Sequence, residues 1–188
     1  MQYVVDANVV VKWLLPEPDS DKADSLIDGY RQHGMQLIAP DIVVAEVGNA
    51  LWQRCDRLKD ISSGEAASAY SDFLDLDLPV HACNTLSEQA LNISIAESHP
   101  IYDTLYISLA MRRGWEFVTA DEKLVNKLGT KFRLIKFLRD LSLASLLLSL
   151  HLRPPRLLRD ADAPAGCCRH GLLAPTAGSR RAGTGYPG

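Results

Sequence analysis

The sequence predicts an α/β fold, a three-layer α/β/α sandwich around a central parallel sheet. Short runs of β-branched and other apolar residues alternate with longer stretches in which apolar residues recur at helical spacing. This alternation is typical of parallel strands joined by helices that cover both faces of a sheet. With 188 residues, of which 47% are hydrophobic, the chain can bury the core of one domain.

The expected elements follow one another without a long gap through residue 135. Strands are expected at residues 3–6, 36–39, 79–83, 116–119 and 131–135. Helices are expected at residues 19–34, 41–51, 62–76, 85–98, 103–113 and 122–128. Asp41 is expected to cap the second of these helices, and Gly114 to end the fifth.

The composition changes after about residue 141. The first 141 residues carry 21 acidic and 14 basic side chains, a net charge of −7, whereas residues 142–188 carry 2 acidic side chains and 6 arginines, a net charge of +4. The second segment is rich in Arg, Pro and Gly and contains no Ile, Val or Phe, so it has few core-forming residues. We therefore expect one domain at residues 1–141 and an atypical tail at residues 142–188, a short helix followed by disorder.

Several classes of protein are disfavoured by the sequence. No signal peptide is recognisable, and no run of about 18 apolar residues predicts a membrane span. Adjacent cysteines rarely bridge, and the cysteine spacing fits neither a zinc site nor a disulfide framework; the cysteines are Cys55, Cys83, Cys167 and Cys168. The acidic domain is not an obvious nucleic-acid binder by charge alone. A cytoplasmic protein with no membrane partner is the expectation.

Four acidic residues lie inside apolar runs or at their ends: Asp6, Glu46, Asp103 and Asp121. Sites in open parallel sheets form at the carboxyl ends of the strands, where Asp6 and Asp121 are expected. Glu46 interrupts an otherwise apolar helix face. Burying several carboxylates together is costly unless a cation lies between them. The sequence therefore predicts a cation site made by these four side chains.

The type of ligand indicates which ion and which chemistry to expect. Carboxylate oxygens, with no His or Cys expected nearby, favour Mg²⁺ or Mn²⁺ over zinc. The five histidines are scattered along the sequence, and we assign none of them to catalysis. Divalent ions held by carboxylates usually act on phosphate esters, because they activate water and neutralise phosphate oxygens.

Each acid also has a purely structural alternative. Asp6 could cap the turn before residues 9–15, Asp103 could cap a helix that begins at residue 104, and Asp121 could cap the helix after it. Capping and metal binding can coexist in one carboxylate. Glu46 is harder to explain structurally, because a glutamate on an apolar helix face needs a partner.

Four motifs occur in order along the chain: V-V-D-A-N-V, V-A-E-V-x-N-A-L, Y-D-T-L-Y-I-S-L-A and F-V-T-A-D. On these motifs, residues 1 to about 140 resemble PIN-domain ribonucleases, and more narrowly the VapC toxins of toxin–antitoxin pairs. The resemblance implies a Mg²⁺-dependent endoribonuclease, with Mn²⁺ as a possible substitute, that cleaves RNA and is silenced by a cognate antitoxin. It also implies a homodimer, although the tail departs from the pattern of the family.

The resemblance carries over to individual residues. Asp6 and Asp103 match the principal metal ligands, and Glu46 and Asp121 match the acids that complete the pocket. Two polar residues, Asn8 and Thr119, match residues that commonly line such pockets, although either could serve local turn hydrogen bonds.

Three rival interpretations remain. The chain could be a non-catalytic module that binds RNA or an antitoxin, with the acids only structuring the pocket. A phosphatase of the haloacid dehalogenase type also begins with a strand and an Asp, but it needs a second Asp two residues later, where this chain has Asn8. A receiver domain is disfavoured because no paired acids accompany Asp6.

Overall fold

The computed structural model describes residues 1–142, except for the side chain of His33. Residues 143–188, nearly all of the predicted tail, lie outside the described residues, so the helix and disorder expected there stay predictions. Within residues 1–142, no helix is long and apolar enough to cross a membrane. Cys55 and Cys83, the cysteines of this part of the chain, are both free.

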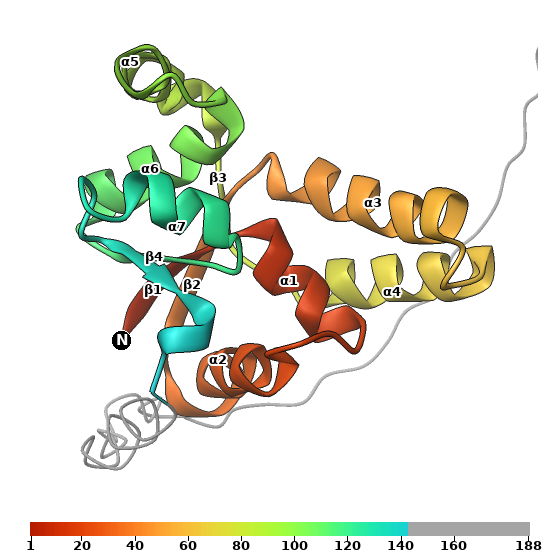
Figure 1. Ribbon diagram of the computed structural model, residues 1–188. Coiled ribbons are helices and arrows are strands. Elements are labelled where there is room, and N and C mark those ends of the chain that lie inside the picture. The colour runs from red at the N-terminus through yellow and green to blue at the C-terminus, as the bar shows by residue number, and fades with distance from the viewer. Residues whose placement is uncertain (143–188) are drawn as a thin grey trace, which may run out of the picture. The chain divides into compact units, whose positions relative to one another are not determined.

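One sheet of five parallel strands organises residues 1–142 (Figure 1). The strands are β1 (Gln2–Val5), β2 (Gln36–Pro40), β3 (Val80–His81), β4 (Glu116–Thr119) and β5 (Ile135–Phe137). Their order is β3-β2-β1-β4-β5, which places β1 at the centre. Val4 of β1 pairs with Ile38 on one side and with Phe117 on the other. The predicted parallel sheet is confirmed.

The helices fall into two groups according to the strands they connect. The β1–β2–β3 connections contain α1 (Ala7–Leu14), α2 (Ser20–His33), α3 (Val43–Gln53) and α4 (Ser63–Asp75). The β3–β4–β5 connections, which cross the sheet in the opposite direction, contain α5 (Ser87–Glu97), α6 (Ile101–Arg113) and α7 (Glu122–Leu128). Because such crossovers are right-handed, the two groups cover opposite faces (Figure 1), which confirms the three-layer α/β/α prediction.

Helix α6 packs against the sheet and has a long buried stretch. Seven consecutive residues of α6, from Thr104 to Ala110, are buried, as expected for a helix covered on all sides. The Tyr106 ring stacks on Phe117 of β4, with ring centroids 5.4 Å apart. Asp103 precedes this buried stretch, so packing against the sheet fixes the backbone that carries it.

Three local predictions differ from the structure. No helix is predicted at residues 7–14, yet α1 forms there, because Asp6 caps it and Val9, Val10 and Val11 are buried. Asp41 does not cap α3; its carboxylate accepts a hydrogen bond from the Cys83 backbone N–H at 3.1 Å instead. The last strand lies two to four residues later than expected, and short π- or 3₁₀-helical turns occur at Arg54–Leu58, Cys83–Thr85 and Leu138–Asp140.

A buried hydroxyl joins α5 to α6. Thr104 is fully buried, and its Oγ1 lies 2.9 Å from each of the Ala90 carbonyl oxygen, the Ile101 carbonyl oxygen and the Ser94 hydroxyl. The polar groups of two helices therefore meet at one side chain. An unpaired buried polar group costs about 1–3 kcal/mol, so this cluster contributes to holding α6 in place.

Replacing Thr104 with Val should lower the free energy of unfolding by about 1–3 kcal/mol, since the isosteric side chain removes the hydroxyl and leaves its partners buried. Urea denaturation measures the change. The matched control is Ser71→Ala, an exposed position on α4, where a change within about 0.5 kcal/mol is expected. Equal stability of the Thr104→Val variant and the wild type would show that the cluster does not hold the two helices together.

Candidate active site at the carboxyl edge of the sheet

A pocket of about 250 Å³ opens where β1 ends. Three of the predicted acids contribute to it: Asp6 after β1, Glu46 on α3 and Asp103 on α6. The remaining lining residues are Ala7, Asn8, Asn49, Ala50, Gln53 and Tyr106. Residues distant in sequence therefore meet at the carboxyl edge of the central strand, the position expected for a site in a parallel sheet.

Asp6 is both a helix cap and a pocket residue. Its Oδ1 accepts a hydrogen bond from the Asn8 backbone N–H, which caps α1. Its Oδ2 accepts a hydrogen bond from the buried Thr119 hydroxyl of β4 and lies 3.5 Å from the Asn8 side-chain nitrogen. The capping alternative is correct for Asp6, and it coexists with exposure to the pocket. Asn8 lines the pocket, whereas the buried Thr119 does not line it and contacts the site through its hydrogen bond to Asp6.

The surroundings of Asp6 penalise its charge. Burial raises the pKa of Asp6 from 3.8 to about 6, the hydrogen bonds from Thr119 and Asn8 oppose the shift, and the charges of Glu46 and Asp103 add to it. The three pocket carboxylates are therefore close enough to repel one another.

Glu46 is held by a tyrosine from the opposite layer. It lies in the first turn of α3, earlier than the expected second turn, because the helix begins at Val43. The Tyr106 hydroxyl donates a hydrogen bond to Glu46 Oε2. Burial raises the pKa of Glu46, the Tyr106 hydrogen bond opposes this, and the charge of Asp103 adds to it. Burial and Glu46 also raise the pKa of Tyr106 well above its usual value, so Tyr106 remains a donor.

Asp103 lies in the first turn of α6, where the helix dipole favours negative charge. The helix begins at Ile101, so Asp103 is not its N-cap, and that structural alternative is wrong. Its Oδ2 lies 2.7 Å from His99 Nε2. Burial raises the pKa of Asp103, the His99 hydrogen bond opposes this, and the charge of Asp121 adds to it.

Asp121 is the predicted acid that does not line the pocket. Its Oδ1 accepts hydrogen bonds from the backbone N–H groups of Lys123 at 2.8 Å and Leu124 at 3.2 Å, so it caps α7. Its own N–H donates to Thr119 Oγ1 at 3.0 Å. Asp121 is therefore linked to Asp6 through Thr119, and its role as a metal ligand stays a prediction.

The donor set has the chemistry of a hard-cation site. Asp6, Glu46 and Asp103 offer carboxylate oxygens to one pocket, and these suit Mg²⁺ or Mn²⁺. Over residues 1–142, however, no three His, Cys, Asp or Glu side chains are already close enough to hold a metal ion. The residues fit the ion in kind, and binding would require the carboxylates to draw closer together.

Four site residues are absent from the sequence predictions. Asn49 and Gln53 follow Glu46 by three and seven positions on α3, and this spacing alone could have placed them on one helix face. Tyr106 follows Asp103 by three positions on α6, which is the same kind of signal. His99 contacts Asp103 and corrects the expectation that no histidine lies near the acids. No spacing rule indicates His99, because it precedes the helix.

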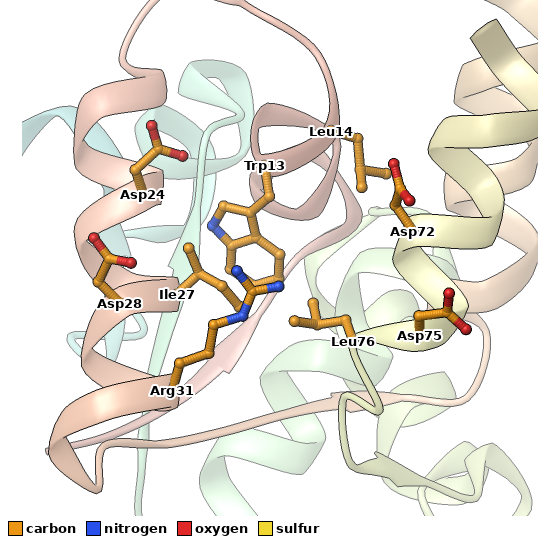
Figure 2. Close-up of a pocket in the computed structure, with 9 residues that line it drawn as sticks. All are labelled: Trp13, Leu14, Asp24, Ile27, Asp28, Arg31, Asp72, Asp75 and Leu76. Carbon is orange, nitrogen blue, oxygen red and sulfur yellow. The ribbon is translucent and has the colours of Figure 1, made fainter.

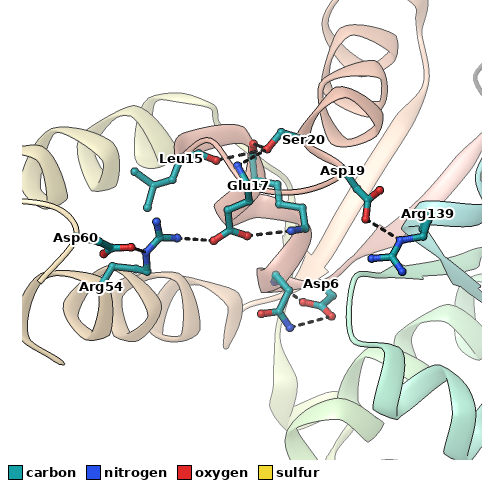
Figure 3. A network of polar contacts seen from close by, with 10 residues as sticks. Asp6, Leu15, Glu17, Asp19, Ser20, Arg54, Asp60 and Arg139 are labelled. Atoms are coloured by element: carbon teal, nitrogen blue, oxygen red, sulfur yellow. Dashed lines mark hydrogen bonds and ion pairs between the residues drawn. The ribbon is translucent and has the colours of Figure 1, made fainter. Parts of the chain in front are cut away.

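Ion pairs connect the segments that carry Asp6 and Glu46 (Figure 3). Glu17, which follows α1, pairs with Lys12 of α1 at 2.9 Å and with Arg54 at the end of α3. Arg54 also pairs with Asp60 at 2.6 Å. The Lys12 side chain is only 11% exposed, so this pair is not a freely solvated surface contact. The network restrains α1 relative to α3.

A larger pocket of about 550 Å³ lies between α2 and α4 (Figure 2), and none of the four acids predicted to form the cation site contributes to it. Trp13 and Leu76 lie between the two helices, and the Trp13 ring nitrogen donates to the Ala23 carbonyl at 2.7 Å. None of the predicted site residues lines this pocket. Its size therefore does not make it the better candidate for chemistry.

Fold and pocket together define an α/β protein with an acidic pocket at the carboxyl edge of a parallel sheet. Residues 3–128 match the PIN domain family, and the chain belongs to this family. The resemblance seen in the four sequence motifs is confirmed at the level of the PIN family.

Several known proteins are similar to this chain. Ribonuclease VapC3 from Pyrobaculum aerophilum is 26% identical over 129 residues, which cover 68% of this chain and 95% of that protein. The crystal structure of PAE2754 from Pyrobaculum aerophilum aligns with a TM-score of 0.58 at 22% identity, over 79% of this chain and 99% of that one, and so shares the fold. The crystal structure of VapBC2 from Rickettsia felis, bound to a DNA fragment from their promoter, aligns with a TM-score of 0.47 at 17% identity, over 73% of this chain and 97% of that one.

The raised pKa of Asp6 predicts how its replacement affects stability. A folded-state pKa of about 6 against 3.8 means that Asp6 favours folding when protonated, and this contribution is lost as pH rises from 3.8 through 6. In EDTA, Asp6→Asn should therefore be more stable than the wild type at pH 8, by up to about 3 kcal/mol, with the difference shrinking toward pH 4.

Urea denaturation across this pH range measures the difference. Asp75→Asn, at an exposed position of α4, is the control and should show no comparable trend. A difference between Asp6→Asn and the wild type that does not vary with pH would contradict the electrostatic penalty at Asp6.

Proposed function

We propose that the protein is a Mg²⁺-dependent endoribonuclease, the toxin of a VapC-type toxin–antitoxin pair. The observation that carries the proposal is the convergence of Asp6, Glu46 and Asp103 on one pocket at the carboxyl edge of the sheet. Membership of the PIN family and similarity to a protein named Ribonuclease VapC3 support the same reading.

Asp6, Glu46 and Asp103 would hold the ion, with Asp121 as a further ligand if its segment moves toward the pocket. When bound, Mg²⁺ or Mn²⁺ supplies a Lewis acid that activates water and offsets the charge of an RNA phosphate. Thr119 and Tyr106 each donate a hydrogen bond that keeps a carboxylate in place. These donors limit the freedom of the acids before the ion arrives, and the carboxylates would draw closer together when it binds.

Neutral amides provide the contacts that an RNA chain needs near so many carboxylates. The side chains of Asn8, Asn49 and Gln53 line the pocket together with the acids. Amide N–H groups can donate to phosphate oxygens and ribose hydroxyls without adding charge. We assign these three residues to substrate contact.

The proposal extends to partners and location. We infer that a cognate antitoxin protein silences the nuclease, that the enzyme acts in the cytoplasm and that it forms a homodimer. The similarity to Ribonuclease VapC3 supports a VapC-type ribonuclease, and the antitoxin partner follows from the resemblance of the four sequence motifs to VapC toxins.

Replacing a pocket acid should abolish cleavage. Asp103→Asn and Glu46→Gln should each lower Mg²⁺-dependent RNA cleavage by at least about 100-fold, because loss of a ligand should cost more than the 10–100-fold typical of residues that only support ligands. Gel analysis of total RNA with Mg²⁺ or with EDTA measures this. Glu88→Gln, an exposed position of α5, is the control. Wild-type activity in both pocket variants would remove the site assignment.

A non-catalytic binding module is the second candidate. It is favoured by one observation, that all three pocket carboxylates already accept hydrogen bonds within the protein, from Thr119, Tyr106 and His99. Such a module would bind RNA or an antitoxin and leave RNA intact with any divalent ion.

Growth of cells that express the chain separates the two candidates. Induction of the wild type should arrest growth, and induction of Asp103→Asn at the same protein level should not. Colony counts after induction measure this. Equal arrest by both forms would support the binding module and contradict the nuclease.

A further inference from the structure

His99 is a mostly buried histidine beside the pocket, with only 11% of its side chain exposed. Its Nε2 lies 2.7 Å from Asp103 Oδ2, four residues further along the chain. The Asp103 side chain is 36% exposed, so water could satisfy it without a protein partner. Asp103 therefore does not need His99 as a hydrogen-bond partner. The contact instead restricts the direction in which the carboxylate points.

The backbone on either side of His99 is restrained. Ser98 ends α5 in the left-handed region with φ 47°, and the Lys127 ammonium group donates to its carbonyl at 2.7 Å. The His99 N–H donates to the Ser94 carbonyl at 3.1 Å, and Pro100 then leads directly into α6. A histidine on this short connection has little freedom, so its ring is a firm support for Asp103.

The second ring nitrogen of His99 has no competing partner. His99 Nδ1 is buried and has no hydrogen-bond partner within the described residues. The contact between Nε2 and Asp103 Oδ2 is therefore the side-chain contact that the described residues give this ring, and it is directed at the carboxylate.

We propose that His99 is a positioning residue, which holds the Asp103 carboxylate in the orientation that a divalent cation in the pocket requires. The inference rests on the proposed metal-dependent function. Partners of this kind behind a metal ligand typically contribute 10–100-fold to metal affinity or activity. His99 does not itself touch the substrate in this account.

A histidine pair elsewhere in the structure provides a matched control. His81 Nε2 lies 2.9 Å from Thr85 Oγ1, also four residues further on, and neither residue lines the acidic pocket. Replacement of His81 removes a similar contact without affecting an acid of the site. His99→Gln is the conservative variant, because its amide N–H can reach the same oxygen.

The first test needs neither metal nor activity. In ¹⁵N NMR spectra of the histidine rings of the full chain, the His99 signals are assigned by their loss in His99→Gln. Asp103→Asn should shift these signals, because it changes the group that Nε2 contacts, and His81→Ala should leave them in place. No change of the His99 signals in Asp103→Asn would overturn the proposal.

The second test measures Mn²⁺ affinity by electron paramagnetic resonance, with thermal melting to confirm folding. His99→Ala should bind Mn²⁺ about 10–100-fold more weakly, and His99→Gln and His81→Ala should stay within about threefold of the wild type. Wild-type affinity in a folded His99→Ala protein would overturn the positioning role. Weaker Mn²⁺ binding by His99→Ala in a protein that cleaves no RNA would support that role and contradict only the proposed nuclease.

Discussion

Mutual repulsion among one buried and two half-buried carboxylates is the constraint on which the site depends. Asp6 is only 7% exposed, and its charge is opposed by burial and by the charges of Glu46 and Asp103. A fold tolerates such an arrangement when hydrogen-bond donors and a counter-charge offset the cost. Thr119, Tyr106 and His99 supply the donors, and the counter-charge is what we assign to a divalent ion.

The fold provides these donors because the two helical layers meet at one edge of the sheet. Asp6 and Glu46 come from the layer of α1 and α3, whereas Asp103, Tyr106 and His99 come from α6 and the connection before it. Burial of α6 along one continuous stretch gives this half of the site a fixed backbone. The packing of the core is therefore directly connected to the geometry of the pocket.

The sequence was sufficient to predict the sheet, the layers and the meeting of Asp6, Glu46 and Asp103, because apolar runs and their flanking carboxylates follow local rules. It left open whether Asp121 caps α7, and it did not reveal that α6 begins before Asp103. A carboxylate at the start of a helix can either accept hydrogen bonds from the helix N–H groups or point into the pocket. Which of the two occurs is decided by the packing of the folded chain. His99 was missed for a similar reason, since its contact arises from the tight connection between two helices and not from a periodic pattern.

Crystals soaked in Mn²⁺ and measured by anomalous scattering test the central claim most directly. The account predicts an anomalous peak in the pocket, at about 2.0–2.2 Å from oxygens of Asp6 and Asp103, with Glu46 turned toward the same ion. Absence of a peak at this place in crystals soaked with millimolar Mn²⁺, with the three carboxylates keeping only their hydrogen bonds inside the protein, would contradict it.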